Sequence, residues 1–273
     1  MFPAVEVLKK IIQRLSSIVL DPWKRSYVWW MARYCVAQRF TPFSLRLPNG
    51  ILLQVADVTS FFAMYRSIFL QRIYDFQTST RKPIIIDCGA NIGLSVLFFK
   101  WLYPKSTVIA YEADKQIFSI LQKNIESAGV KNIELHEQAV WKKNTKLSFL
   151  PDHADGGAID EKIKSDVTVR AINFATELKK YSHIDFLKID IEGAELEVLL
   201  HCRKELKRVH NLFFEFHSFS QQKQQLSDLL HILEQIGFRY HITSEYGLSS
   251  PFLPHRGTKM DMQLNIFAWK ELV

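Results

Sequence analysis

The chain has 273 residues, of which 48% are apolar, and its 35 Lys and Arg against 28 Asp and Glu give a formal charge of +7. This is ordinary globular usage and excludes a mainly disordered, collagen-like or coiled-coil chain. Three scattered cysteines without a CxxC pair exclude a disulfide framework and a zinc ribbon, and favour reduced thiols in the cytoplasm. No uncharged apolar run reaches about 18 residues, so we expect no membrane-spanning helix.

The basic excess lies in the N-terminal third. Residues 1–82 carry 12 Lys and Arg and 4 Asp and Glu, a net of +8, whereas residues 83–273 carry 23 and 24. Apolar residues at helical spacing over 5–19, with lysines and arginine between them, predict a basic amphipathic helix. Such a helix either rests on anionic lipid or acidic glycan, or packs on the main domain with its lysines in solvent. The expected location is the cytoplasm, with residues 1–40 as the part that would touch a membrane surface.

The next segments predict helices over 23–40 and 59–76, separated by a β-hairpin. Its strands, 43–47 and 51–55, flank Pro48-Asn49-Gly50, a turn in which glycine is favoured. The aromatic stripe of residues 59–76 indicates core packing. We divide the chain into a basic helical extension, a hairpin and helix that pack on the core, and a cofactor-binding domain, spanning 1–42, 43–82 and 83–273.

From residue 83 onward, short apolar runs alternate with helical patterns. The expected helices are 93–103, 114–128, 194–202 and 221–236. A hairpin is expected between 146–150 and 167–170, around a polar Gly156-Gly157 loop. The expected strands are 84–86, 107–111, 133–139, 184–189, 211–216, 238–243 and 263–269. This alternation predicts an α/β fold in which a mostly parallel, seven-stranded sheet has helices on both faces.

The chemistry-bearing residues follow the first two strands of this domain, at the edge where such folds bind ligands. The first strand leads into Asp87-Cys88-Gly89-Ala90-Asn91-Ile92-Gly93, which is neither a dinucleotide loop nor a P-loop. Asp87 is a suitable acceptor for an ammonium group, and Glu112, after the second strand, for two ribose hydroxyls. A ligand with an amino-acid end, a ribose and no pyrophosphate is S-adenosylmethionine.

This D-x-G-x-N-x-G motif, followed by an acidic residue after the next strand, resembles the class I methyltransferases, whose fold is Rossmann-like. The resemblance implies S-adenosyl-L-methionine as the cofactor. The residues expected to bind it are Asp87, Gly89, Ala90, Asn91, Gly93, Glu112, Ala113 and Ala139.

The fourth-strand segment narrows the resemblance. Lys188-Ile189-Asp190-Ile191-Glu192-Gly193-Ala194-Glu195 is similar to the K-I-D-x-E-G-x-E signature of the FkbM family of methyltransferases. Two further segments resemble that family: the apolar run 212–217, which contains Glu215 and His217, and the Leu47-Pro48-Asn49-Gly50 hairpin. The resemblance covers roughly residues 45–270. The family implies O-methylation, often of sugar hydroxyls in glycans, glycolipids or glycosylated natural products.

Four residues are candidates for catalysis: Asp190, Glu192, Glu215 and His217. A sugar hydroxyl must lose its proton during methyl transfer, and a general base, His217 or Asp190, can accept it. Alternatively, Asp190, Glu215 and His217 hold Mg²⁺, which lowers the pKa of the hydroxyl. We favour the metal-free base, because the motifs show no full set of metal ligands. Lys188, within a buried strand, requires a carboxylate partner.

Two other functions compete with this one. A nucleic-acid (RNA) methyltransferase would use the basic N-terminal third to follow phosphates. The fourth strand is not followed by N/D-P-P-F/Y, and no Pro-Cys pair offers a cysteine nucleophile. A non-catalytic adapter that kept the fold is disfavoured by the intact motifs around Asp87, Glu112 and Asp190. The expected partner is therefore a hydroxyl-bearing saccharide or glycolipid, not a nucleic acid.

Overall fold

The computed structural model describes most of the chain after residue 18. The described residues are 16, 19–34, 36–150, 158–159, 165–220, 222–247, 252 and 260–271. The amphipathic helix predicted over 5–19 falls almost wholly outside this set, as does the Gly156-Gly157 loop. Among the described residues, no helix has both the length and the apolar character needed to cross a bilayer.

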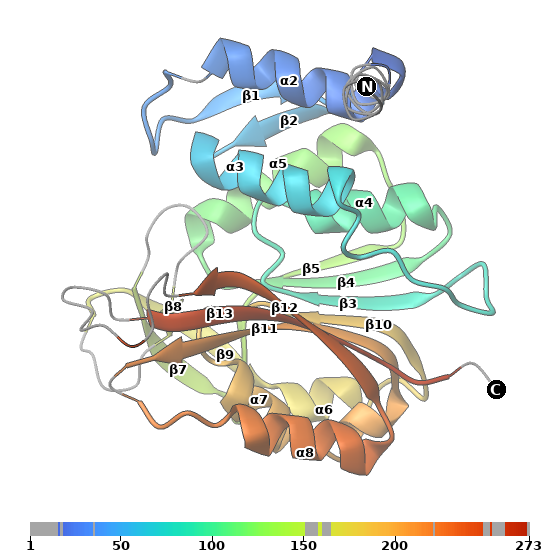
Figure 1. Ribbon diagram of the computed structural model, residues 1–273, viewed down its shortest axis with the longest axis vertical. Helices are drawn as coiled ribbons and strands as arrows, with labels where there is room; N and C mark the ends of the chain where they lie inside the picture. The colour runs from blue at the N-terminus through green and yellow to red at the C-terminus, as the bar shows by residue number, and fades with distance from the viewer. Residues whose placement is uncertain are drawn as a thin grey trace, which may run out of the picture.

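A seven-stranded sheet forms the centre of the molecule (Figure 1), with the order β12-β13-β11-β10-β3-β4-β5. Neighbouring strands are parallel, except that β13 runs antiparallel to both β11 and β12. The strands are β3 (Ile84–Cys88), β4 (Thr107–Glu112), β5 (Ile133–Glu137), β10 (Ile184–Ile189), β11 (Val209–Phe219), β12 (Arg239–Gly247) and β13 (Met260–Trp269). The predicted α/β fold with a mostly parallel, seven-stranded sheet is confirmed. The strand order reverses between β3 and β10, which places a ligand crevice at their carboxyl ends.

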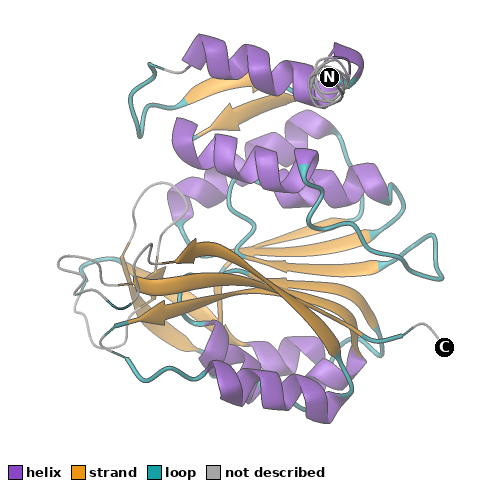
Figure 2. Cartoon of the chain, in the orientation of Figure 1, coloured by secondary structure: helices purple, strands orange, loops and turns teal. Residues whose placement is uncertain are grey.

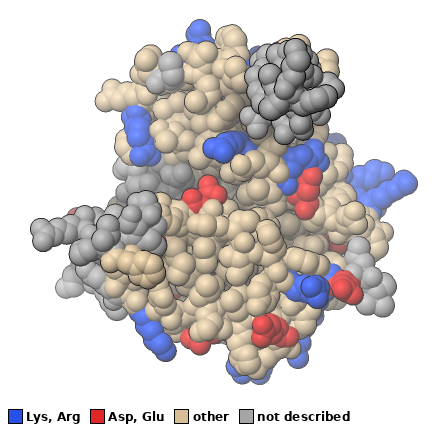
Figure 3. Space-filling model, in the orientation of Figure 1, with Lys and Arg blue, Asp and Glu red and all other residues tan. Residues whose placement is uncertain are grey.

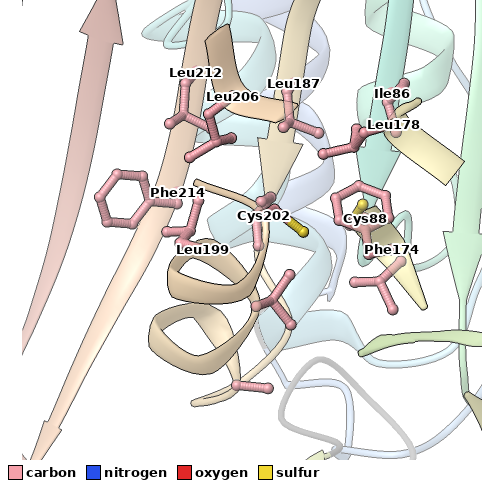
Figure 4. Packing of buried hydrophobic residues seen from close by; sticks show 14 of the residues in the cluster. Ile86, Cys88, Phe174, Leu178, Leu187, Leu199, Cys202, Leu206, Leu212 and Phe214 are labelled. Carbon is pink, nitrogen blue, oxygen red and sulfur yellow. The ribbon is translucent and has the colours of Figure 1, made fainter. Parts of the chain in front are cut away.

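Helices cover both faces of the sheet (Figure 2). One face packs against α4 (Leu94–Leu102) and α5 (Lys115–Ala128), and the other against α6 (Phe174–Leu178), α7 (Glu195–His201) and α8 (Leu226–Ile236). The start of α5 is fixed by Asp114, whose side chain accepts hydrogen bonds from the Gln116 and Ile117 amides. The second face holds an apolar core in which Cys88 and Cys202 are buried free thiols (Figure 4).

The N-terminal elements form a further layer over α4 and α5 (Figure 1). They are α2 (Pro22–Tyr34), β1 (Phe43–Arg46), β2 (Leu52–Val55), α3 (Val58–Tyr65) and the π-helical turn η1 (Arg66–Leu70). The predicted hairpin is confirmed, since β1 and β2 pair antiparallel around Gly50, whose φ is 88°. Aromatic side chains of α2 and α3 join the apolar cluster of α4 and α5. The boundaries at residues 42 and 82 remain a prediction.

Three predicted helices are shorter than expected. The helix predicted over 23–40 ends at Tyr34, the one predicted over 59–76 ends as η1 at Leu70, and the one predicted over 221–236 begins at Leu226. After η1 the chain turns at Arg72, whose φ is 56°. This turn brings Tyr74 against Phe186 and Phe213 of the sheet. Burial of the Tyr74 ring there offsets the loss of helical hydrogen bonds.

The strand predicted over 133–139 is divided in two, which corrects the sequence analysis. β5 ends at Glu137, and β6 (Ala139–Trp141) joins a second sheet with the order β6-β9-β7-β8. The other members of this sheet are β7 (Thr145–Leu150), β8 (Ala158–Ile159) and β9 (Thr168–Asn173). β7 and β9 form the predicted hairpin, with Lys146 opposite Arg170. The break at Gln138 arises because buried Val140 and Trp141 pack in the second core face.

Candidate active site

A cavity of about 360 Å³ lies at the carboxyl ends of the central strands. Its walls come from the loops after β3 and β4, the break between β5 and β6, the ends of β10 and β11, strands β12 and β13, and the segment from α3 to Tyr74. On the face drawn in Figure 3, an acidic group lies between the upper and lower parts of the molecule. A cavity of this volume is within the usual range for a small-molecule site.

Gly89 allows the loop after β3 to lie against the loop after β10. Its φ is 81°, and a Cβ added there would stand 1.7 Å from the carbonyl oxygen of Asp190. The amides of Gly89 and Ala90 both donate to the carbonyl of Tyr111, at 2.9 and 3.0 Å. The cavity floor is therefore made of backbone, which joins β3, β4 and β10.

Glu112 is held in a fixed orientation at the cavity wall. Its Oε2 accepts a hydrogen bond from the Asn91 amide at 2.9 Å, and its Oε1 accepts one from the Asp114 amide at 2.8 Å. Burial raises the pKa of Glu112 to about 7, although these two bonds act in the opposite direction. Each oxygen has a further lone pair for a ligand hydroxyl. The predicted residues Ala90, Asn91, Ala113 and Ala139 also line the cavity.

Asp87 stands one layer behind the cavity. It is fully buried, is not among the described residues that line the cavity, and accepts a hydrogen bond from the Ser95 hydroxyl. Lys188 Nζ lies 3.4 Å from Asp87 Oδ1 and 3.1 Å from Asp190 Oδ2, and it donates to the Gly89 carbonyl at 2.8 Å. Burial opposes the charge on Lys188, but the two aspartates raise its pKa well above the ordinary value. Lys188 thus has the carboxylate partners expected of it, and it links buried Asp87 to Asp190 at the cavity wall.

Gly93 acts as a close-packing position rather than a cavity residue. Its φ is 94°, and a Cβ added there would meet the Leu121 side chain at 2.7 Å. It is not among the described cavity residues. This glycine therefore lets α4 and α5 approach each other behind the loop.

The ends of β10 and β11 bring the predicted catalytic residues together. These strands are parallel neighbours with Ile189 opposite Phe214, so Asp190 and Glu215 follow side by side. His217 Nε2 lies 3.7 Å from Glu192 Oε2 and 3.6 Å from Glu215 Oε2. Asp190, Glu192 and Glu215 line the cavity, whereas His217 is buried behind them and is not among the described lining residues.

The charges of this cluster are strongly coupled. Burial, followed by the charge of Asp190, raises the pKa of Glu192 to about 9 and that of Glu215 to about 8. Burial would lower the pKa of His217, but the surrounding glutamates raise it to about 9. At neutral pH these shifts favour the imidazolium form of His217 and the protonated forms of Glu192 and Glu215.

Glu195 shapes the loop that carries Glu192. Its carboxylate accepts hydrogen bonds from the amides of Ile191 and Gly193, at 3.0 and 2.9 Å. It also lies 3.6 Å from His217 Nδ1. Glu192 has a φ of 56°, a left-handed conformation that is uncommon for a non-glycine residue and is found at functional sites. The loop is thus held in a strained form that directs Glu192 to the cavity.

The cavity residues that were not predicted from the sequence include Tyr74, Glu245, Gln263 and Asn265. Tyr74 lies within the helix predicted over 59–76. Gln263 and Asn265 alternate with apolar residues in β13, and this two-residue period was an available signal for one polar face.

The alternative with a divalent cation gains no support. Within the part of the chain that the structure describes, no group of three or more His, Cys, Asp or Glu side chains is arranged to hold a metal ion. This applies to the proposed set of Asp190, Glu215 and His217, whose histidine is committed to three carboxylates.

Known proteins resemble the chain in sequence and fold. The Methyltransferase FkbM domain matches residues 87–240. Methyltransferase 1 of Beauveria bassiana is 27% identical over 50% of this chain and 65% of its own length, just under two thirds. The 31-O-demethyl-FK506 methyltransferase FkbM of Streptomyces tacrolimicus is 26% identical over 57% of this chain and 74% of its own. The crystal structure of an FkbM methyltransferase from Methylobacillus flagellatus covers 78% of this chain and 56% of its own, with 17% identity and a TM-score of 0.43.

The family match includes the glycine loop, Glu112 and the cluster from Asp190 to His217. The central sheet has the class I methyltransferase arrangement, and this family and fold imply use of S-adenosylmethionine. Because the domain model matches more than half of the chain, the protein belongs to the FkbM family of methyltransferases.

Proposed function

We propose that the protein transfers a methyl group from S-adenosylmethionine to a hydroxyl of a saccharide, in a glycan, a glycolipid or a glycosylated natural product. The observation that carries this proposal is the pairing, in one cavity, of the doubly held carboxylate of Glu112 with the acidic cluster of Glu192 and Glu215. The first suits the ribose of the cofactor. The second suits an acceptor that must lose a proton.

One side of the cavity fits S-adenosylmethionine. We call it the cofactor wall, and it contains Gly89, Glu112, Ala113, Ile117, Ala139 and Val140. Glu112 has one lone pair left on each oxygen for the two ribose hydroxyls. Ala113, Ile117, Ala139 and Val140 provide a small apolar surface for the adenine. Asp87 lies behind the cavity and fixes Lys188 and Ser95, whereas Asp190 lines the cavity and is the carboxylate available to the ammonium group of the cofactor. When bound, the cofactor supplies a methyl group already activated on a sulfonium.

We assign the proposed base to Glu192 and Glu215 rather than to His217 or Asp190. His217 is protonated at neutral pH and lies behind the cavity wall, so it holds the two carboxylates instead of accepting a proton. Glu192 and Glu215 face the cavity, and a carboxylate with a pKa raised toward the working pH is an effective general base. The pair accepts the hydroxyl proton as one coupled unit. Asp190, fixed by Lys188, positions the acceptor.

Oxygen as the methylated atom has separate support. The Streptomyces relative is an O-methyltransferase by name, acting at the 31-O position of its own substrate. The carboxylates of the site are acceptors of hydrogen bonds from hydroxyls. They disfavour a polyanion, and this argues against the alternative nucleic-acid acceptor because phosphate would meet Asp190, Glu192 and Glu215.

The test combines cofactor binding with turnover. We expect S-adenosylmethionine to bind, measured by calorimetry, and methyl groups to be transferred to members of a panel of sugars and lipid-linked glycans but not to RNA. Methylation of RNA, with no transfer to any saccharide, would contradict the proposal. For substitutions of the cavity glutamates, Glu126→Gln is the matched control, since this exposed glutamate lies on α5 outside the cavity.

Contact between residues 1–40 and an anionic membrane is a separate proposal. Trp29 is 58% exposed and Val28 49% exposed on α2, close to several basic residues of that helix. Such a surface suits the interface of an anionic bilayer. Replacement of Val28 and Trp29 by serine should leave a folded, cofactor-binding protein that sediments more weakly with anionic vesicles. Unchanged sedimentation would mean that this surface does not contact the membrane.

A further inference from the structure

The far wall of the cavity is made of amide–carboxylate pairs on β12, β13 and β11, the three strands at one edge of the central sheet. Gln263 and Asn265 lie two residues apart on β13 and both line the cavity. The Gln263 side-chain amide donates to Glu215 of β11, and Asn265 Nδ2 donates to Glu245 Oε2 of β12 at 3.3 Å. Each amide group therefore gives a hydrogen to a carboxylate and leaves its oxygen for another donor.

A β-bulge directs Glu245 into this wall. The pairing of β12 with β13 shifts register between Ser244 and Tyr246, so Glu245 has no partner of its own in the ladder. Bulges of this kind turn a side chain away from its regular direction and are frequent beside active sites. The turned side chain of Glu245 lines the cavity.

Asn265 supplies an independent indication that this wall binds a ligand. The residue is only 5% exposed, and among the described residues no donor reaches its Oδ1. A buried acceptor without a hydrogen-bond donor is unfavourable and is normally satisfied by protein, water or ligand. The atom belongs to a side chain that lines the cavity, so a ligand bound there is placed to donate to it.

The negative charge of the far wall indicates which chemical group on the ligand donates to Asn265 Oδ1. Lys188 is the single Lys, Arg or His among the described cavity residues, and it is already committed to Asp87, Asp190 and the Gly89 carbonyl. Glu215 is already paired with His217 behind the cavity wall, whereas among the described residues no Lys, Arg or His forms an ion pair with Glu245. A neutral hydroxyl would satisfy the hydrogen bonds of Glu245 but not its charge. An ammonium group carries three N–H donors and one positive charge, and so satisfies both.

This wall is distinct from the cofactor wall. Strand β13 is separated from β3 by β11 and β10, which corresponds to about 14 Å at the usual spacing of about 4.8 Å between strands. Glu245, Gln263 and Asn265 also lie outside residues 87–240, the stretch that matches the family domain. Family membership therefore does not determine what this wall binds.

We propose that the acceptor carries a protonated amine beside the hydroxyl that is methylated, and that Glu245 and Asn265 Oδ1 bind this ammonium group while Glu215 faces the hydroxyl. The inference rests on the proposed function and specifies its substrate class as an amino sugar or a similar amino alcohol. Anionic acceptors are disfavoured by the same carboxylates.

Matched pairs of probes test the inference. Glucosamine and its β-1,4-linked trimer are compared with N-acetylglucosamine and the N-acetylated trimer, which keep the remaining hydroxyls but lack the charge. With S-adenosylhomocysteine present, we expect the amines to bind at least tenfold more tightly by calorimetry, and to be the better methyl acceptors. Equal binding of the two forms, or no binding of either amine at millimolar concentration, would overturn the inference.

Single substitutions test whether Glu245 causes the preference for the amine over the N-acetylated probe. Glu245→Gln keeps the shape of the side chain and removes its charge, so the preference for the amine should fall several-fold. Glu271→Gln, an exposed residue beyond the end of β13, should leave it unchanged. Cofactor binding separates the two proposals. If S-adenosylmethionine does not bind, the proposed function fails. If it binds and the amine preference is absent or insensitive to Glu245→Gln, only this inference fails.

Discussion

The two walls of the cavity are built on different principles. The cofactor wall is made by backbone: Gly89 packs on the Asp190 carbonyl, and both oxygens of Glu112 accept main-chain hydrogen bonds. The acceptor wall is made by titratable side chains, Glu192, Glu215 and their neighbours, whose charges are coupled through His217. The main-chain contacts of the cofactor wall do not titrate, although the Glu112 carboxyl that they orient does, with a pKa of about 7. A wall of coupled carboxylates responds to pH, to charge and to the ligand.

The largest expected effect removes the base from the acceptor wall. Glu215→Gln should lower kcat by about 10²–10⁴-fold, because general-base assistance is lost. The affinity for S-adenosylmethionine should be unchanged, since Glu215 belongs to the other wall. Steady-state kinetics and calorimetry measure the two quantities. A parallel loss of cofactor affinity would show that the walls are not independent.

Next in size is the steric disruption of the cofactor wall. Gly89→Ala places a Cβ 1.7 Å from the Asp190 carbonyl oxygen, so the free energy of unfolding should fall by about 3 kcal/mol or more. Gly129→Ala is the matched control: its φ is also positive, at 61°, but nothing lies within 4 Å of the added Cβ. It should cost only about 1–2 kcal/mol from backbone strain. Denaturant titration compares them, and equal losses would contradict the close packing of Gly89.

A smaller effect is expected from the ligand contact of the same wall. Glu112→Ala should weaken S-adenosylmethionine binding by about 1.5–3 kcal/mol, because a charged hydrogen-bond acceptor for the ribose is lost. Calorimetry measures this change. Glu112→Gln keeps one acceptor oxygen and should lose less. If the alanine variant binds as tightly as the wild type, the ribose lies elsewhere in the cavity.

The smallest expected effect is a shift in pH dependence. The pKa values of Glu215 and Glu192, about 8 and about 9, are raised by burial, so activity should rise as these carboxylates ionise between about pH 7 and 9. The positive charge of His217 lowers both values, and His217→Gln should move the profile upward by about one pH unit. A profile of kcat/KM against pH measures the shift. A downward shift, or none, would mean that the charge of His217 does not lower the pKa values of Glu192 and Glu215.

The sequence predicted the cofactor wall better than the acceptor wall, for a physical reason. Gly89 and Glu112 follow consecutive strands of a regular α/β pattern, so their meeting at one edge follows from topology alone. Glu245 reaches the cavity only because of a bulge in β12, and Tyr74 only because η1 ends and the chain turns at Arg72. Bulges and turns of this kind depend on tertiary packing, which local periodicity does not encode.

The raised pKa of His217 could also not be predicted from the sequence. The spacing of Glu215 and His217 placed them on one face of a strand, as the structure has them. Their charges, however, depend on Glu192 and Glu195, which come from the neighbouring loop. Only the assembled cluster shows that the histidine is a cation.

The segment from α3 to Tyr74 closes one side of the cavity, although it precedes the residues that match the family domain. Glu192 and Glu215 of the acceptor wall lie within that domain, so only part of the cavity enclosure is separate from it along the chain. An exchange of residues 58–74 between two members of the family is therefore expected to change how the cavity is enclosed and to leave Glu112, Glu192 and Glu215 in place.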